Sequence, residues 1–328
     1  MKLTISTSGG QTVENAWNLV GNVVWSGDKQ RAARTLTFDL AASEADPNLP
    51  AVSCPVGGIV SLWNDGGTPL FQGEVVRRTL SDQEAYLSVT VHDRGMFLAG
   101  NDGTEKIRDE TAEAAVHRIC GKYGIPVGEL AATGVPLRRK FSAVPLWSIV
   151  TTLYTLASQQ TGMQYLARFE WDKLTVRPRS EQGESLIIRP RSNLLAMATT
   201  QSIEDMRNSV GIYDKDGSRI STVRDENAVA IYGLLEEHIT QREGQDAQGE
   251  AKQILAEHGY EQRVTVECIG DGRLTTGRTV VLQSATGLSG VFWIDSDTHR
   301  WSGGNYTASL TLNLRNVMYQ TETGGDLE

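Results

Sequence analysis

Cysteine is scarce in this sequence, and basic residues are in the minority. The 328 residues contain three cysteines, Cys54, Cys120 and Cys268, which are widely separated and show no CxxC or Cys/His metal-ligand spacing. We therefore expect buried thiols in a reducing compartment. Lysine and arginine total 31 against 40 aspartate and glutamate residues, so the formal net charge is -9. This balance argues against a protein whose main task is to grip nucleic acid phosphates.

Long hydrophobic runs are also missing. No window approaches the ~18 apolar residues that a membrane-spanning helix needs, so we expect no stable membrane insertion. The N-terminal sequence MKLTISTSGGQTVEN has one lysine and no sustained apolar core, which is not the pattern of a secretory signal. The chain is expected to be made in the cytoplasm and to stay there unless something other than general secretion releases it.

The length of the chain predicts several modules, because single hydrophobic cores stop growing near ~250–300 residues. Residues 1–100 and 192–320 have the period-two alternation and the turn signals of β-rich modules. Residues 101–191 combine helical and strand patterns and predict a mixed α+β module. The polar tail, residues 321–328, is expected to be frayed.

Three helices are predicted from capping signals and helical spacing. The first follows Thr111 as N-cap, and the second covers residues 145–162, with proline in its first turn and glycine at its end. The third covers residues 246–258 inside the second β-rich module. The nearby run AVAIYGLLEEHIT, residues 228–240, is expected to be extended.

Two distant segments share one hairpin pattern. Residues Gly58–Val91 and Gly277–Leu312 each have a glycine before an alternating strand, a glycine-bearing turn, a second strand and a last alternating strand. The second strand is entered through Phe71 in one copy and Phe292 in the other. A chain that repeats a small β-unit is usually assembling a shape, so this internal repeat predicts a structural role.

Candidate catalytic residues are few, and each has a structural alternative. His92 and Asp93 are neighbours at a strand end and point to opposite faces, so they cannot orient each other as a catalytic triad requires. His299 has no second ligand at metal-binding spacing and is expected to be a packed histidine. The Glu-Glu-His run at residues 236–238 lacks the HExxH pattern and predicts a solvated charge cluster. Nothing in the sequence selects a glycosidase carboxylate pair, and no cofactor or metal is predicted.

Short basic clusters leave two interpretations open. They are an electropositive docking strip for an acidic partner, or charged linker surfaces, and the second is favoured because short charge runs usually mark solvated faces. The clusters are Arg77-Arg78, Arg138-Arg139-Lys140, and the group Arg177, Arg179, Arg189 and Arg191.

The second half of the chain resembles a known family. The strings SIEDMRNSVGIYDKDG, IYGLLEEHIT, AQGEAKQILAEHG, VTVECIGDGRLTTGRTVVL and TGLSGVFWIDSDTHRWSGGNYTASLTL are similar to the tail hub proteins of contractile phage tails and phage-derived particles, including late control protein D-like proteins. The resemblance extends over roughly residues 85–315 and is most specific between Ser202 and Leu312. The positions that carry the family signature in this sequence are Asn208, Gly233, Gly270, Gly277, Gly290 and His299.

The resemblance implies two tube-like antiparallel β-barrel domains plus a mixed insertion domain. It further implies a baseplate hub: a homotrimer whose six barrels join a sixfold tail tube to a threefold central spike in a virion or phage-like particle. The tail tube protein, the spike protein, other baseplate proteins and the tape measure protein are the partners it implies, with DNA only as passing cargo. Two other classes stay open, a tail-associated peptidoglycan hydrolase and a monomeric carbohydrate-binding β-protein. The first is disfavoured because no lytic motif appears and His117 is the only histidine of residues 101–190.

Overall fold

A computed structural model of the whole chain describes residues 1–7, 12–41, 52–80, 86–179, 186–241, 247–285 and 287–327. The chain forms two compact units. The main unit consists of Met1–Met197 and Val266–Glu328, and the inserted unit is Ala198–Thr265. Part of the expected 192–320 module is therefore a separate unit, and each unit is treated by itself below.

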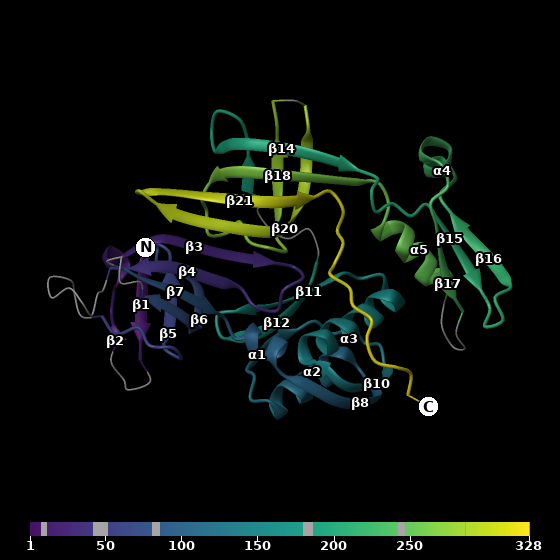
Figure 1. Cartoon of the computed structure of the whole chain (residues 1–328), viewed down its shortest axis with the longest axis horizontal. Helices are drawn as coiled ribbons and strands as arrows, with labels where there is room; N and C mark the ends of the chain where they lie inside the picture. The colour runs from purple at the N-terminus through teal and green to yellow at the C-terminus, as the bar shows by residue number, and fades with distance from the viewer. Residues whose placement is uncertain are drawn as a thin grey trace. The chain divides into compact units, whose positions relative to one another are not determined.

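A thirteen-stranded sheet contains both β-rich modules (Figure 1). The first half comprises β1 (Lys2–Ser6), β2 (Thr12–Val13), β3 (Val20–Asp28), β4 (Thr35–Leu40), β5 (Ile59–Trp63), β6 (Pro69–Leu80) and β7 (Leu87–His92), with a short 3-10 helix at Trp17–Leu19. The second half comprises β13 (Leu186–Ile188), β14 (Leu194–Ser202), β18 (Glu261–Ile269), β19 (Thr279–Gln283), β20 (Ser289–Ser302) and β21 (Asn305–Asn313).

Both halves of this sheet have the same strand order. The first half reads β3-β4-β7-β6-β5-β1, and the second reads β14-β18-β21-β20-β19-β13. With the six strands of each half numbered along the chain, both orders are 2-3-6-5-4-1. The repeated hairpin unit is present as two antiparallel meanders, β5–β6–β7 and β19–β20–β21, and each has a bulge between its second and third strands. The copies differ at the last position, because β1 is antiparallel to β5 whereas β13 is parallel to β19.

Strand β20 joins the two halves. Its first residues, Ser289–Trp293, pair with β19, and the later residues Ser296–Trp301 pair with β3. The opposite edge of β20 pairs with β21. The predicted mainly β architecture with a mixed middle module is confirmed. Within the described residues, the two halves form one continuous sheet and neither half closes into a barrel of its own.

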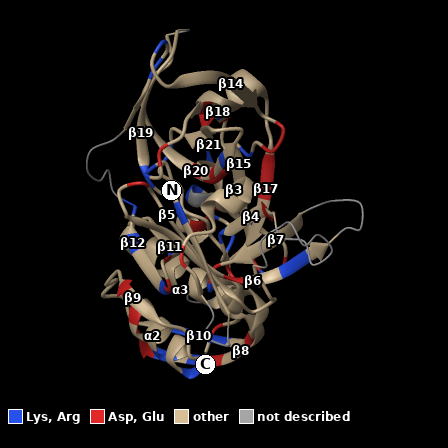
Figure 2. Cartoon of the chain, turned by 90° about the vertical axis from the view of Figure 1, so that its left-hand side faces the viewer, with Lys and Arg blue, Asp and Glu red and all other residues tan. Residues whose placement is uncertain are grey.

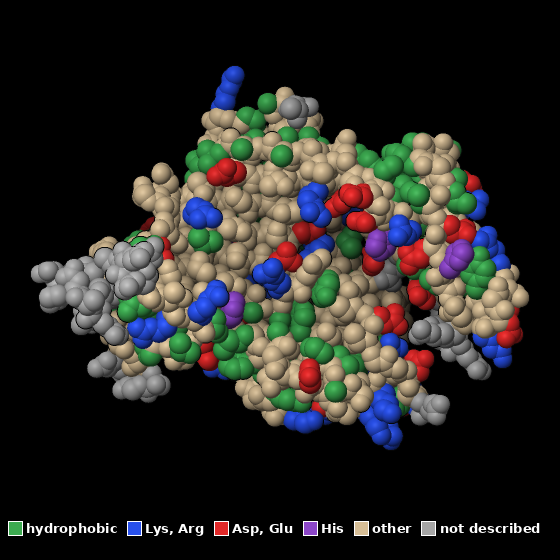
Figure 3. Space-filling model, in the orientation of Figure 1, with side chains coloured by type: hydrophobic (Ala, Val, Ile, Leu, Met, Phe, Trp, Pro, Cys, Tyr) green, Lys and Arg blue, Asp and Glu red, His purple; other side chains and the backbone are tan. Residues whose placement is uncertain are grey.

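Two unpaired strand edges of the sheet, among the described residues, concern its longer strands; the short strands β2 and β13 also have one partner each. Strand β14 ends the sheet, and its sequence LLAMATTQS carries no charge. Its Leu195 side is solvent-facing, with 55% of the residue exposed, and hydrophobic side chains gather over β14 at the upper edge of the molecule in Figure 3. Strand β6 pairs with β5 over Pro69–Glu74, and Val75 exchanges backbone hydrogen bonds with Gly57 and Gly58. The basic end of β6, Arg77–Leu80, continues past β5 and has no strand paired on that side among the described residues (Figure 2).

The middle module packs helices against two small sheets. Its elements are α1 (Gly95–Gly100), β8 (Asp102–Glu110), α2 (Ala112–Lys122), β9 (Val127–Leu130), β10 (Leu137–Pro145), α3 (Leu146–Thr161), β11 (Tyr165–Glu170) and β12 (Lys173–Pro178). Helix α3 is the centre of this core, and the buried Tyr154 donates its hydroxyl to the Ala131 carbonyl at 3.1 Å. The two helices predicted here are confirmed, and Gly162 ends α3 in the left-handed conformation that favours glycine.

The inserted unit is a three-stranded sheet with two helices. Its elements are β15 (Ser209–Tyr213), β16 (Arg219–Arg224), α4 (Glu226–Tyr232), β17 (Glu236–Thr240) and α5 (Ala247–Glu257). Helix α4 makes the crossover between the parallel strands β15 and β17. The expectation of an extended run over residues 228–240 is therefore wrong in its first half. The Asp225 side chain caps α4 by accepting the Ala228 N–H at 3.0 Å, and Gly233 with φ of 83° ends it.

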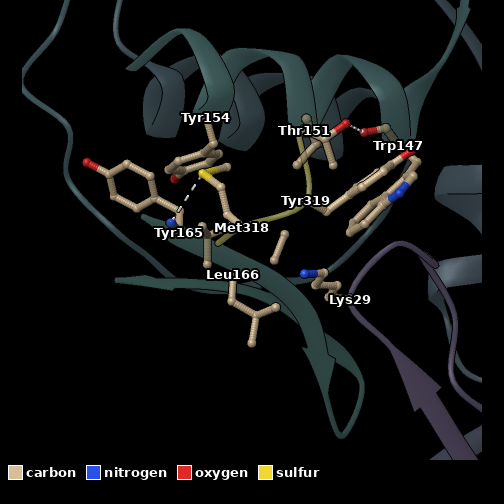
Figure 4. A pocket seen from close by; sticks show the side chains of 11 residues that line it. Lys29, Trp147, Thr151, Tyr154, Tyr165, Leu166, Met318 and Tyr319 are labelled. Carbon is tan, nitrogen blue, oxygen red and sulfur yellow. Dashed lines mark hydrogen bonds between the residues drawn. The ribbon is translucent and has the colours of Figure 1, made fainter. Parts of the chain in front are cut away.

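The end of the chain is held against the middle module. We call residues 316–326 the C-terminal strap, and Figure 4 shows its Met318 and Tyr319 side chains beside α3. The Tyr165 N–H lies 3.5 Å from the Met318 sulfur. Lys140 and Gly325 exchange two backbone hydrogen bonds, and Arg139, 5% exposed, donates to the Thr323 carbonyl at 3.0 Å. The frayed tail expected from residue 321 thus has ordered partners as far as residue 326.

Truncation after Tyr319 tests the strap. We expect the variant to lose about 2–3 kcal/mol of unfolding free energy in urea melts, because the buried Arg139 guanidinium loses Glu322 and Asp326. Truncation after Asp326 is the matched control and should unfold like the full chain. Equal stability of all three chains would show that the strap contributes nothing.

Candidate functional site

A buried polar cluster lies beneath the junction of β20 and β3. Asp297, His299 and Trp301 alternate along β20 and share one face, and the first two are fully buried. Asp297 accepts both terminal nitrogens of Arg34, with Nη1 at 3.1 Å from Oδ1. The two residues are 263 positions apart in the chain, so this ion pair ties the first half of the sheet to the second.

The charge of Asp297 is maintained in spite of its burial. Desolvation raises the pKa of this carboxyl, but the Arg34 guanidinium and a hydrogen bond from His299 outweigh it and hold the pKa well below its usual range. The backbone N–H of Thr276 donates to Asp297 Oδ1 at 2.6 Å and the Thr276 hydroxyl at 2.7 Å. Asp297 therefore also fixes the segment before β19.

His299 is packed in the core, as the sequence predicted. Its Nε2 lies 3.0 Å from the Leu274 carbonyl, which can only accept, so Nε2 carries the hydrogen. The Tyr306 hydroxyl is hydrogen-bonded to Nδ1 at 2.8 Å. The Trp301 ring stacks on Tyr306 at 4.3 Å between centroids, and the His299 ring lies 4.9 Å from that of Trp25 on β3.

Two of the signature glycines belong to this cluster. A side chain at Gly270 would overlap the Tyr306 ring, so the chain can pass over β21 only with glycine there. Gly277 has φ of +85°, and a side chain on it would overlap Leu166 of the middle module. The structure thus brings Gly270, Gly277 and His299 together at one place in the main unit.

The other signature positions lie elsewhere. In the inserted unit, Asn208 is buried and its side chain donates to the Gly233 carbonyl at 2.6 Å and accepts the Leu235 N–H at 2.8 Å. Asn208 therefore fixes the turn that Gly233 makes after α4. Gly290 lies at the start of β20, and nothing in its surroundings explains a glycine there.

Asp93 and His92 do not form a catalytic pair. Asp93 Oδ2 accepts the Arg34 backbone N–H at 3.1 Å, and its Oδ1 accepts that of Gly95 at 2.8 Å. His92 instead lies 3.1 Å from the Thr35 hydroxyl. Burial raises the pKa of Asp93 to about 7 against the opposing effect of the two N–H donors. Asp93 is a buried turn residue that supports the backbone of Arg34.

The 236–238 run belongs to an ion network of the inserted unit. Glu236 pairs with Arg219 and accepts the Ser209 hydroxyl at 2.9 Å, and the Ser209 bond and Arg219 together lower its pKa. His238 Nε2 lies 3.1 Å from Glu236 and its side chain is 60% exposed. The network links β15, β16 and β17 on their solvent-facing side, as expected for a charge cluster.

The described residues contain no group of three or more metal-ligating side chains that could hold an ion. Within the same residues, no helix is long and apolar enough to cross a membrane. The three cysteines are buried and free, and burial raises the pKa of the Cys54 and Cys120 thiols to about 11 each.

Sequence reasoning missed the partners of His299. Asp297 and Arg34 were not singled out, although the sequence D-x-D-x-H-x-W at residues 295–301 places two carboxylates, an imidazole and an indole at period two on one face of a strand. Such a pattern in a central strand signals a buried polar cluster. The basic group at residues 177–191 was recognised as one strip, but only Arg177 and Arg179 line the groove treated below, whereas Arg189 and Arg191 do not.

The fold is that of phage tail proteins. A 43 kDa tail protein of prophage MuSo2 from Shewanella oneidensis is similar with a TM-score of 0.73, 14% identity, and coverage of 95% of this chain and 98% of that chain. A tail protein from Neisseria meningitidis MC58 is similar with a TM-score of 0.72, 15% identity, and coverage of 95% of each chain. These likenesses establish the fold.

The family follows from the sequence. The YQBQ-like family model matches residues 23–313, and the chain belongs to this family. The phage-like element PBSX protein XkdQ of Bacillus subtilis is 23% identical over 307 residues, which cover 90% of this chain and 93% of the relative. The resemblance to phage tail proteins drawn from the sequence is thus confirmed.

Replacing Asp297 tests the junction. We expect Asp297→Asn to lose about 3–5 kcal/mol of unfolding free energy at neutral pH, because Arg34 keeps its charge without a carboxylate. The double variant Arg34→Met/Asp297→Leu should lose less than the sum of the single changes in a urea-melt cycle. The exposed Asp216→Asn is the matched control.

The folded-state pKa of Asp297 lies below the unfolded value. The stability that Asp297 contributes to the fold is therefore full above about pH 4 and falls at lower pH.

The pH dependence of Asp93 has the opposite sign. Its folded-state pKa of about 7 lies above the unfolded value, so the stability it contributes is full below about pH 4 and is lost as the pH rises through 7. Relative to Asp93→Asn, the wild type should lose about 1.4 kcal/mol per pH unit in urea melts between these values. Parallel stability curves for the two proteins would contradict the assignment.

Proposed function

We propose that the chain is the structural hub of a phage-type baseplate. In this proposal, three copies form a ring with pseudo-sixfold symmetry that joins a sixfold tail tube to a threefold central spike and lines the channel. Membership of a family whose relatives include a phage-like element protein, together with the tail-protein fold, supports a structural tail component.

The duplicated strand order is the observation that carries the hub proposal. Each chain contributes two six-stranded halves of order 2-3-6-5-4-1. Three chains therefore present six similar halves, which matches a sixfold tube. The halves differ in the direction of their last strand and in the unit inserted between β14 and β18. Their differences repeat only three times around the ring, which matches a threefold spike.

The junction inside the chain suggests the junction between chains. The second strand of the first half, β3, pairs with the later part of the fifth strand of the second half, β20. The equivalent strands are β14 and β6, and each has an unpaired edge within the described residues. If β14 of one copy pairs with the end of β6 of the next, the same junction occurs six times around the ring and covers both of these edges.

The chemistry of the two edges agrees with this pairing. Strand β14 has no charge, and a long uncharged edge is normally covered in a native assembly. At the end of β6, Leu80 is 47% exposed and offers apolar surface next to two arginines. A chain of net charge -9 also suits a channel through which DNA passes without sticking.

The role is structural and not enzymatic in this proposal. The tail tube, the spike, other baseplate proteins and the tape measure protein are the partners, and the particle tail tip is the location after assembly in the host cytoplasm. The hydrolase alternative predicts lysis of purified peptidoglycan by the isolated chain, which would overturn a purely structural role.

Photo-cross-linking tests the hub. With p-benzoylphenylalanine in place of Leu195, irradiation should link β14 of one copy to residues 75–80 of another, and native mass spectrometry should show a trimer. Ile220, 51% exposed on β16, is the matched control position and should give no links to β6. A monomer at micromolar concentration, or links from position 195 to other strands, would contradict the ring.

A further inference from the structure

A groove lined by arginines lies within the main unit. It has a volume of about 620 Å³ and lies between the β11–β12 hairpin, residues 272–279 and the start of β6. Glu170 is the single carboxylate among its described lining residues. The six arginines that line it are Arg34, Arg168, Arg177, Arg179, Arg273 and Arg278. Such a concentration of one charge is unexpected in a chain with more acidic than basic residues.

Internal ion pairs account for only part of this charge. Arg168 and Arg177 share the one carboxylate of Glu170, at 2.6 and 2.9 Å. Arg179 reaches Asp295 at 3.5 Å, and Asp295 is also bound by Lys29 at 2.7 Å. Arg177 also lies 3.6 Å from Glu129, Arg34 is paired with Asp297, and Arg273 is paired with Asp271 at 2.7 Å. Five carboxylates thus serve Lys29 and five of the six arginines, which leaves the charge of Arg278 in excess at the groove.

Arg278 has no carboxylate partner among the described residues, and it is exposed. Burial lowers the pKa of the Arg168 guanidinium, and Glu170 opposes this effect. The positive charges of Arg278 and Arg34 lower the pKa of Arg168 further, so the charge of Arg278 acts inside the groove. Like charges that are held together in this way favour an anion from outside the chain.

Three of the arginines also have an unused donor. The Nε atoms of Arg34, Arg177 and Arg179 are buried and have no hydrogen-bond acceptor within the described chain. The Arg179 side chain is fully buried. Buried donors normally have partners, so these three nitrogens indicate acceptors that the described residues do not supply.

The walls of the groove indicate which anion fits. Guanidinium groups match planar carboxylates through paired hydrogen bonds. Between the arginines, the groove presents the apolar side chains of Leu70, Phe169 and Trp171. A peptide can place carboxylates on the arginines and apolar side chains on these residues, whereas a sugar-phosphate backbone has no apolar counterpart. The volume lies within the ~300–1,000 Å³ range of pockets for small ligands and short segments.

We infer that the arginine groove binds a short acidic peptide segment of another tail protein, with the exposed Arg278, which has no carboxylate partner among the described residues, as the docking residue. The identity of the partner as a tail protein rests on the proposed hub function, but the binding chemistry does not. The electropositive docking strip considered from the sequence is thus relocated: Arg177 and Arg179 belong to it, together with Arg168 of the same hairpin and three arginines from distant segments.

Peptide binding tests the groove. The probe is a fluorescein-labelled hexapeptide of glutamate and leucine with four glutamates, and its anisotropy is titrated with the full chain at low salt. We expect binding that weakens at least tenfold in Arg278→Glu, weakens less than threefold in Arg278→Lys, and is lost when the probe carries glutamine in place of glutamate. Because Arg278 is exposed and unpaired, the variants should melt at the wild-type temperature.

Arg138→Glu is the matched control. It makes the same change of charge at an exposed arginine of β10 that does not line the groove, and it should bind the probe like the wild type. No binding by the wild type, equal weakening by Arg138→Glu, or displacement of the probe by an equal concentration of a single-stranded DNA 12-mer would each overturn the inference. Native mass spectrometry of the same variants separates this result from the hub proposal, because loss of peptide binding with an intact trimer rejects the groove alone.

Discussion

The pairing of β20 with β3 is the constraint on which the rest of the main unit depends. It joins two halves that are otherwise complete meanders, and it does so over six residue pairs from Ser296 to Trp301. Beneath it, Asp297 receives the Arg34 guanidinium from the first half and Thr276 from the loop before β19. The same carboxylate therefore sets the distance between the halves and the path of the chain into the second meander. Loss of the Asp297 charge would weaken the contact between the two halves and the hydrogen bonds that hold the loop before β19.

A buried ion pair is not required for stability alone, since apolar residues of similar volume often stabilise a core as well or better. Its value here lies in register. A slip of β20 by one residue would turn Asp297 to the other face of the sheet and leave Arg34 buried without a carboxylate, which costs several kcal/mol. An apolar pair would tolerate such a slip far better. The buried Asp93, which holds the Arg34 backbone, adds a second fixed point to the same residue.

Much of this architecture could be predicted from the sequence, because it depends on local patterns. The repeated hairpin pattern predicted two meanders, and the capped amphipathic runs predicted α2, α3 and α5. Contacts between distant segments could not be predicted in the same way. No local pattern pairs Arg34 with Asp297, and the shared strand order appears only when the strands are placed in a sheet. Helix α4 was missed because β-branched and aromatic residues favour strands, whereas the Asp225 cap and Gly233 decide the local conformation. The C-terminal strap was missed because polarity was taken for disorder, although Arg139 supplies its binding partner.

The two free edges explain why a duplicated fold favours a closed assembly. A single copy exposes the uncharged strand β14 and the end of β6. The backbone N–H and C=O groups of an uncharged edge can pair with a strand of another chain. A dimer joined through one such pair still exposes one edge of each kind. The contact proposed between copies joins different strands on the two partners, so it would be heterologous, and such a contact leaves no open end only when the rotation between copies closes a ring. The internal junction of β3 and β20 already sets the angle between successive halves. If every junction repeats that angle, the number of copies is fixed by the twist and bulge of one strand, β20, and a threefold ring needs that angle to be one sixth of a turn.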